Sequence, residues 1–350
     1  MNRYFLLIIA AIILCCSSTV KSQNGFVVWT EGYGCDKELK FNKLTNGIVG
    51  PKQTAVKKGV GADIWVQISY DGEWVAFGRS INSFTSKYDH CDPYSVDKAD
   101  IYVANIAKGK NLPAKAIRVD HGYLPSWAMD ENAKDPSKPK LLYYTRHSDR
   151  SIRKAVINPD GTIASKDVKH SEFHVTVTGS KAHTQGSPDG RYIAFRPDSI
   201  IVYDYDQKKN VSGAGGKGFS PCWGPRSKYL MWGNNKVCRI ENGQTTMEAK
   251  KSGIGIRQGT SNDVKYDRDT LYITACTKCG ANFCYIVFKA VDISNGGWNV
   301  GHSTIVGYKG TYSDIHIFFE ALELSAPSKK ISIGSKLELT ASLKNEKGEP

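Results

Sequence analysis

The sequence predicts an all-β protein built as a circular or solenoid array of similar repeats, and three observations lead to this fold class. One apolar strand of five residues recurs six times. A turn-like segment precedes five of these strands, most clearly SPDG at 187–190 and YDG at 70–72. Almost no stretch keeps the apolar period of about 3.6 residues that is typical of a helix. In such arrays, function is expected on the loops of one face. The six strands are FVVWT (26–30), WVAFG (74–78), LLYYT (141–145), YIAFR (192–196), YLMWG (229–233) and LYITA (271–275).

The first 22 residues have the pattern of an export signal. Arg3 supplies a positive charge, an apolar run follows, and small residues precede the expected cleavage before Gln23. A lipid anchor at Cys15 or Cys16 is the alternative. No second apolar run of membrane-spanning length follows. We therefore expect the mature chain to be secreted, periplasmic or at the cell surface, without a transmembrane segment.

The chain has a formal net charge of +13. Such an excess can attract acidic polysaccharide, an anionic cell surface or nucleic acid. Export argues against nucleic acid as a partner. The lysines occur in scattered pairs, so the alternative is that they only solvate the loops. The pairs are Lys57-Lys58, Lys208-Lys209, Lys250-Lys251 and Lys329-Lys330.

Each repeat reads as four strands, A to D, in which the apolar strand is B. The clearest repeat has strand A near 181–186, the SPDG turn, strand B at 192–196 and strand C at 200–206. Asp189-Gly190 suits a tight turn because glycine accepts a positive φ without a Cβ clash. B–C and D–A connections then share one face of the array, and A–B and C–D connections share the other.

The segment SPDGRYIAF (187–195) resembles the repeat signature of TolB-like six-bladed β-propellers, and YDGEWVAF (70–77) is a second, looser copy. The resemblance covers roughly residues 26–317. It implies a six-bladed β-propeller of four-stranded antiparallel blades at 23–321. It implies no particular activity, because propellers host binding modules, lyases, hydrolases and peptidases alike. No cofactor is expected.

The ends of the repeat region predict closure of the array. FVVWT has no strand A before it, and TYSDIHIF (311–318) has the composition of a strand A with no blade after it. We expect 311–318 to complete the first blade, which removes open sheet edges.

Residues 322–350 are similar to the opening strands of a bacterial Ig-like domain. Two insertions, 79–99 and 130–140, are expected to be solvent-exposed loops.

A ligand site is predicted where the A strands line the channel of the propeller. Aligned A strands have a small or polar residue at the third position in every repeat. Alternate residues of a strand share a face, so the first position joins this face nearer the B–C side. We predict a site for a polysaccharide or a cell-surface protein at the channel mouth, with Trp65 as a platform for a sugar ring. A channel filled with water is the alternative. The third-position residues are Gln67, Ser126, Gln185, Cys222, Asp263 and Asp314, and the predicted ligand residues are Trp65, His183, Gln185, Asp263 and Asp314.

Seven cysteines follow the predicted signal, which suggests up to three disulfides and a free thiol in an oxidising compartment. Cys276-x2-Cys279-x4-Cys284 resembles a metal knuckle but lacks a fourth local ligand. We instead expect a Cys276–Cys284 disulfide across a seven-residue loop, and no metal site. Cys35 and Cys91 lie in neighbouring B–C connections and are expected to pair.

Cys222 and Cys238 lie on strands A and C of one blade, with strand B between them. Their separation of about 9–10 Å, from strand spacing, exceeds disulfide reach. Both are therefore expected to stay reduced and buried.

The histidines show no metal spacing apart from a weak His170-x3-His174 pattern, and no Gly-x-Ser-x-Gly elbow is present. Arg146-His147 follows a B strand and lies on the predicted functional face, although a surface pair is the simpler interpretation. The leading hypothesis is a secreted, non-enzymatic binding protein, with no catalytic residue assigned. The alternative is a propeller lyase or hydrolase that acts on acidic polysaccharide.

Overall fold

The computed structural model describes residues 21–32, 36–80, 99–169, 184–187, 189–196, 199–218, 221–223, 227–232, 236–251, 270–280, 283–292, 299–325 and 340–344. Within these ranges almost all regular secondary structure is antiparallel β-strand, which confirms the predicted all-β class. The chain divides into two compact units. The smaller unit comprises Met1–Gly25, Leu44–Ile48 and Ile317–Pro350, and the larger comprises Phe26–Lys43 and Val49–His316.

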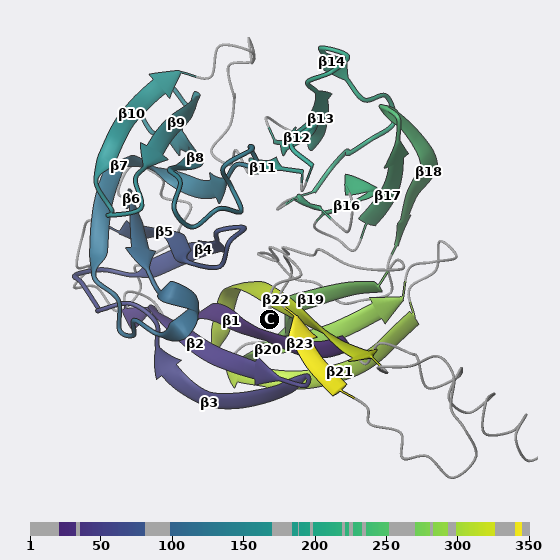
Figure 1. Cartoon of the computed structure of the whole chain (residues 1–350). Helices are drawn as coiled ribbons and strands as arrows, with labels where there is room; N and C mark the ends of the chain where they lie inside the picture. Colours follow the sequence, from purple (N-terminus) through teal and green to yellow (C-terminus); the bar gives the residue numbers. More distant parts are fainter. Residues whose placement is uncertain are drawn as a thin grey trace, which may run out of the picture. The chain divides into compact units, whose positions relative to one another are not determined.

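The strands follow one another mostly as antiparallel meanders (Figure 1). The sheet orders are β23-β22-β1-β2-β3, β10-β9-β8-β7-β6-β5-β4, β11-β12-β13-β14, β15-β16-β17-β18 and β19-β20-β21. The strands are β1 Lys21–Glu31, β2 Glu38–Thr45, β3 Ile48–Thr54, β4 Asp63–Ile68, β5 Trp74–Ser80, β6 Ala99–Asn105, β7 Ala116–Trp127, β8 Lys140–Arg146, β9 Ile152–Ile157, β10 Ile163–Lys169, β11 Gln185–Gly186, β12 Tyr192–Phe195, β13 Ile201–Asp204, β14 Lys209–Asn210, β15 Cys222–Trp223, β16 Tyr229–Trp232, β17 Lys236–Glu241, β18 Gln244–Lys251, β19 Thr270–Gly280, β20 Phe283–Asp292, β21 Asn299–Tyr308, β22 Gly310–Ser325 and β23 Thr340–Lys344.

The seven-stranded sheet consists of two four-stranded meanders that share β7. The first half of β7 pairs with β6, where His121 lies opposite Asp100, and the second half pairs with β8, where Gly122 lies opposite Arg146. A Cβ on Gly122 would lie 2.7 Å from the carbonyl oxygen of Thr145, so the junction requires a glycine. β7 is therefore strand D of one repeat and strand A of the next.

The B strand β12 buries one face against the preceding sheet and the other against the following sheet. Tyr192 and Ala194, the first and third residues of β12, lie in a cluster with β15, β16 and β17. Ile193 and Phe195, the second and fourth residues, lie in a separate cluster with β8 and β9. A strand buried on both faces has no polar side, which explains the uninterrupted apolar character of the repeat.

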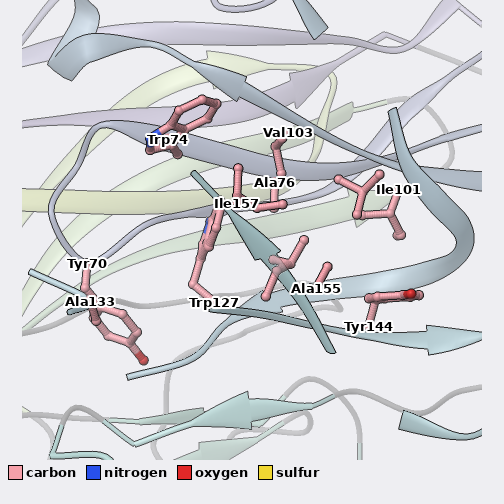
Figure 2. Close-up of a cluster of buried hydrophobic side chains, with 12 residues drawn as sticks. Tyr70, Trp74, Ala76, Ile101, Val103, Trp127, Ala133, Tyr144, Ala155 and Ile157 are labelled. Carbon is pink, nitrogen blue, oxygen red and sulfur yellow. The ribbon is translucent and has the colours of Figure 1, made fainter. Parts of the chain in front are cut away.

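Figure 2 shows the same arrangement between the two meanders that share β7. Trp74 and Ala76, the first and third residues of β5, share a buried cluster with Leu142 and Tyr144, the second and fourth residues after Lys140 in β8. The pattern of β12 is thus repeated one sheet earlier. Successive four-stranded sheets packed face to face through their B strands are the arrangement of a β-propeller.

The SPDG and YDG turns have the same hydrogen-bond network. The Ser187 hydroxyl donates to Asp189 Oδ1 (2.6 Å) and accepts from the Tyr192 backbone N–H (2.9 Å). Gly190 supplies the positive φ, +76°, that the turn requires. The recurring serine two residues before the aspartate is therefore a structural part of the repeat. The equivalent bonds of the other turn join Ser69 Oγ to Asp71 Oδ1 (2.5 Å) and Trp74 N to Ser69 Oγ (2.9 Å).

The two ends of the larger unit meet in one sheet, as the sequence predicts, because β22 lies beside β1. The Asp314 carboxylate accepts a hydrogen bond from the backbone N–H of Ile68 in β4 (2.6 Å). His316 packs against Phe26 with ring centroids 5.5 Å apart. A Cβ on Gly72 would lie 2.8 Å from the same imidazole. β22 therefore supplies the strand A that FVVWT lacks and also contacts the next repeat.

The insertion at 130–140 is not a simple solvent loop, contrary to expectation. Ala133 and Lys140 are buried, and the Lys140 ammonium lies 3.0 Å from the Asp71 carboxylate. Lys140 also donates to the carbonyl oxygens of Asn132 (2.8 Å) and Asp135. The insertion therefore packs on the YDG turn of the preceding repeat. The other insertion lies outside the described residues from 81 to 98.

Outer strands carry many of the scattered lysines. β3 includes the exposed residues Pro51 and Lys52, β14 begins at the exposed Lys209, and β18 ends at Lys250-Lys251. Lysine and proline on an outer strand discourage pairing with another chain. The exposed Lys209 fits the interpretation of the scattered lysines as solvated surface charge.

In the smaller unit, β23 pairs with the end of β22, with Ser325 opposite Thr340 and Ala321 opposite Lys344. In the described part of the chain, no helix has the length and apolar character needed to cross a membrane.

Cys222 and Cys238 lie on either side of β16, opposite Met231 and Leu230, as predicted. Both are reduced and buried, and burial raises the pKa of the Cys238 thiol to about 11. We expect neither thiol to react with an alkylating reagent in the folded protein, because the reactive form is the thiolate. Peptide mapping before and after denaturation would measure this, and a Cys222–Cys238 disulfide would contradict it.

Candidate functional site

The strand register confirms the predicted alignment of the inner A strands. In four repeats the residue at the third position lies opposite the third residue of the B strand. We call these four residues the inner-strand column. The pairs are Gln67 with Ala76, Ser126 with Tyr143, Gln185 with Ala194 and Cys222 with Met231.

A strands of consecutive repeats also contact each other. Two tryptophans at equivalent positions each donate an indole hydrogen bond to the carbonyl of a glutamine in the preceding A strand. In addition, the Tyr70 hydroxyl donates to the carbonyl oxygen of Gly186 (3.0 Å), which joins the YDG turn to β11. Residues that are distant in the sequence thus converge. The indole bonds are Trp127 Nε1 to Gln67 O (3.1 Å) and Trp223 Nε1 to Gln185 O (3.0 Å).

Three A-strand segments bury polar atoms that have no hydrogen-bond partner in the described part of the chain. These atoms are Trp65 Nε1, Ser126 Oγ, Thr184 Oγ1 and Gln185 Oε1. The four residues are between 1% and 7% exposed. Buried polar groups are normally satisfied by protein or by ordered water. The inner strands therefore retain capacity for water or for a polar ligand.

Trp65 is not the exposed aromatic platform that the sequence predicts. Its side chain is 6% exposed, and a Cβ on Gly78 would lie 2.5 Å from the indole ring. The cause is a bulge between Ile64 and Gln67, where Trp65 has a φ of +56°. An extra residue in a strand breaks the alternation of faces. Trp65, the first residue of its aligned A strand, is therefore turned away from the face on which it was expected.

Among the other predicted residues, Asp314 is 1% exposed, and its carboxylate accepts hydrogen bonds from two backbone N–H groups. This bonding gives it a structural role in closure. His183 and Asp263 lie outside the described residues. So do Cys35 and Cys91, whose predicted disulfide therefore stays a prediction.

The strands that carry Cys276 and Cys284 are paired. β19 and β20 remain antiparallel neighbours beyond Cys276, which lies opposite Ile286. The predicted Cys276–Cys284 disulfide stays a prediction.

A row of charged side chains crosses four strands at the B–C side of the larger unit. Asp63, Arg79, Asp100 and His121 lie opposite one another in β4, β5, β6 and β7. Arg79 makes a two-pronged ion pair with Asp63 at 2.6 and 2.9 Å. Arg118 binds Asp100 in the same way at 2.6 and 3.1 Å. The two carboxylates of the row are thus compensated by two guanidinium groups, one from Arg79 in the row and one from Arg118 beside it.

The environments of the two carboxylates shift their pKa values in opposite directions. Burial raises the pKa of Asp63, even though the hydrogen bond from Arg79 opposes this. Burial also acts on Asp100, but the hydrogen bonds from Arg118 and His121 together outweigh it, and the pKa of Asp100 is lowered. Asp100 is therefore held in its ionised form.

His121 belongs to a group of rings at the junction in β7. Its Nδ1 lies 3.0 Å from Asp100 Oδ1, and its ring centroid lies 4.4 Å from that of His147. Tyr123 stacks on His147 at 5.0 Å, and Trp65 lies 6.2 Å from Tyr123. His147 Nε2 lies 3.0 Å from the Ala99 carbonyl oxygen. A buried aromatic group thus supports two imidazoles on the predicted functional face.

Sequence reasoning identified His147 and Trp65 separately but missed Asp100, Arg118 and His121. These residues come together because β6 and β7 pair in one particular register, which spacing along the chain does not reveal. The available signal was Asp120-His121-Gly122-Tyr123, a polar segment at the point where strand D becomes strand A.

No protein-family model and no curated protein matches the chain. Among solved structures, candidate 6-phosphogluconolactonases from Bacteroides fragilis and Bacteroides uniformis align with TM-scores of 0.49 and 0.48 at 14% and 17% identity. These alignments cover 86% and 91% of this chain, and 91% and 95% of those chains. A functionally unknown protein from Desulfotomaculum acetoxidans aligns with a TM-score of 0.49 at 14% identity, covering 86% of this chain and 89% of that chain. Because these TM-scores lie below 0.5, the functions of these proteins are not transferred to this chain. The fold is assigned from the strand pairing and the packing of the sheets.

Proposed function

We propose that this chain is a secreted binding protein that holds a polysaccharide at the inner strands of its larger unit. In this proposal residues 1–22 are an export signal, 23–321 form a TolB-like six-bladed propeller, and 322–350 begin an Ig-like domain. The observation that supports binding is the set of buried polar atoms without partners on the inner strands: Ser126 Oγ, Thr184 Oγ1 and Gln185 Oε1.

The chemistry of these atoms favours a ligand rich in hydroxyl groups. The Gln185 side-chain oxygen is only an acceptor, and the Ser126 and Thr184 hydroxyls can each act as donor or acceptor. A sugar hydroxyl both donates and accepts, so one kind of ligand group can satisfy all three. A surface protein, the other partner expected from the sequence, offers such groups only at its serine, threonine and tyrosine side chains.

The presence of polar residues at these buried positions also has an energetic cost. A buried polar group without a partner costs about 1–3 kcal/mol. Apolar residues at the same positions would avoid this cost. Polar residues that lower stability without a structural partner are typical of functional sites.

Replacement of Gln185 or Ser126 by alanine is expected to weaken polysaccharide binding by about 1–3 kcal/mol, the cost of losing one buried hydrogen bond. The fold should remain intact, because the hydrogen bond from Trp223 is accepted by the backbone carbonyl of Gln185, which alanine retains. A glycan array would identify the ligand, and calorimetric titration would measure the loss. Gln53→Ala, in the exposed part of β3, is the matched control and should bind like the wild type.

Two results would contradict the proposal. One is unchanged affinity in both inner-strand variants while their melting curves show an intact fold. The other is a loss of stability by about 1–3 kcal/mol in Ser126→Ala, because this would mean that the hydroxyl has a structural partner such as a fixed water.

A further inference from the structure

The Asp100 carboxylate holds two exposed groups, His121 and Arg118, side by side. Arg118 uses Nε and Nη2 for Asp100, and His121 uses Nδ1. The side chain of Asp100 is 11% exposed, whereas those of Arg118 and His121 are 52% and 41% exposed. Within the described residues, His121 Nε2 and Arg118 Nη1 have no hydrogen-bond partner. One shielded carboxylate therefore presents an imidazole nitrogen and a guanidinium nitrogen to solvent.

The contact with Asp100 prepares the imidazole to act as a base. A carboxylate that accepts the Nδ1 proton fixes the tautomer with the lone pair on Nε2 and stabilises the imidazolium that forms after proton uptake. Asp100 stays ionised because its pKa is lowered. The neighbouring ring of His147, 4.4 Å away and stacked on the buried Tyr123, limits movement of His121. His121 is thus oriented before any ligand arrives.

Arg118 is the group of this site that can bind an anionic substrate. The ion pairs Arg79–Asp63 and Arg118–Asp100 are internally compensated, and the Asp120 carboxylate, which also acts on Arg118, accepts a hydrogen bond from the Tyr144 hydroxyl. The open edge of Arg118 can bind a substrate carboxylate directly, since guanidinium groups recognise carboxylates well. Hydrolysis by two carboxyl groups fits less well, because the carboxylate of this row nearest His121 is already bound to Arg118 and His121.

We propose that this chain also has a lyase activity, in which His121, oriented by Asp100, removes a proton from an acidic polysaccharide whose uronate carboxylate binds Arg118. His121 Nε2 takes the proton from the carbon next to the carboxylate. The electron pair of that bond forms a carbon–carbon double bond, the bond between the adjacent carbon and the glycosidic oxygen breaks, and the oxygen leaves with the electron pair of the broken bond. The leaving oxygen gains a proton from water, and the imidazolium returns its proton to solvent. The atoms balance without an oxidant or another reactant.

The test follows unsaturated product by ultraviolet absorbance with polygalacturonate, alginate and hyaluronate, with dextran as the uncharged control. The wild type should release product from at least one uronate polymer and none from dextran. His121→Gln should lower the rate by about 10²- to 10⁴-fold, the usual contribution of a general base. Arg118→Gln should mainly raise KM. Arg150→Gln, an exposed arginine on the turn after β8, is the matched control and should leave both parameters unchanged.

Asp100 acts through His121, so Asp100→Asn tests positioning. It should lower kcat and displace the acid limb of the rate against pH, whereas a merely structural role would change only the melting temperature. Absence of unsaturated product from every uronate polymer would overturn the inference, as would undiminished activity in folded His121→Gln. Tight polysaccharide binding without product would leave the proposed binding function intact and reject the lyase activity, so the two proposals fail separately.

Discussion

Deletion of residues 310–350 is expected to abolish cooperative unfolding of the larger unit. The deletion removes β22, whose residues Ser313, Asp314, Ile315 and His316 are all buried. It also exposes the pairing edge of β1. A loss on this scale should exceed the total stability of about 5–15 kcal/mol that is usual for a domain.

The matched truncation removes only residues 326–350 and keeps β22. It should unfold cooperatively with a similar midpoint, followed by tryptophan fluorescence in urea. Asp314→Asn in the full chain is a milder test and should cost about 1–3 kcal/mol, because it weakens the carboxylate's bonds to the Ile68 and Ile315 N–H groups. If both truncations unfold alike, pairing of β22 with β1 does not hold the larger unit together.

Lys140→Ala is expected to destabilise the protein by about 3–5 kcal/mol, the cost of removing one partner from a buried ion pair. The Lys140 and Asp71 side chains are 3% and 1% exposed, and their charged groups lie 3.0 Å apart. Without the ammonium, Asp71 would remain as a buried charge in the turn before β5. The carbonyl of Asn132 would also lose its donor.

The exposed Lys138 provides the control, since Lys138→Ala removes the same charge from the same insertion and should change stability by less than about 0.5 kcal/mol. The double variant Lys140→Met with Asp71→Asn should recover part of the loss, because neither charge then remains buried. Chemical denaturation of the four proteins measures these differences. Equal effects at positions 138 and 140 would show that the ion pair contributes nothing.

The repetitive parts of the structure could be predicted from the sequence because they depend on local patterns. The B strands, the SPDG turn, the alignment of the inner-strand column and the closure by β22 all follow from apolar alternation and recurring turn residues. Cys222 and Cys238 followed from strand spacing in the same way. These features repeat, so each copy supports the interpretation of the others.

The parts of the structure that were not predicted depend on local features that occur once, such as a bulge or one particular pairing of two strands. A bulge at Trp65 buries an indole that regular alternation would place beside Gln67. The Asp100–His121 contact requires a particular pairing of β6 with β7. Lys140 is buried only because the insertion before it folds back on a neighbouring turn. No repeat carries a second copy of these events, and the sequence offers no periodic signal for them.

The packing of the B strands β5, β8, β12 and β16 has a consequence for assembly. The face made by the first and third residues fits the face made by the second and fourth residues of the next B strand, so the contact between sheets is head-to-tail. Contacts of this kind end only when the series closes on itself, and otherwise they can continue from one molecule to another. Pairing of β22 with β1 is such a closure within one chain. A variant in which β22 is released would therefore expose an unpaired edge of β1 and a free β22 that can pair with the β1 of another copy. Loss of the intramolecular pairing should therefore lead to polymerisation as well as to unfolding.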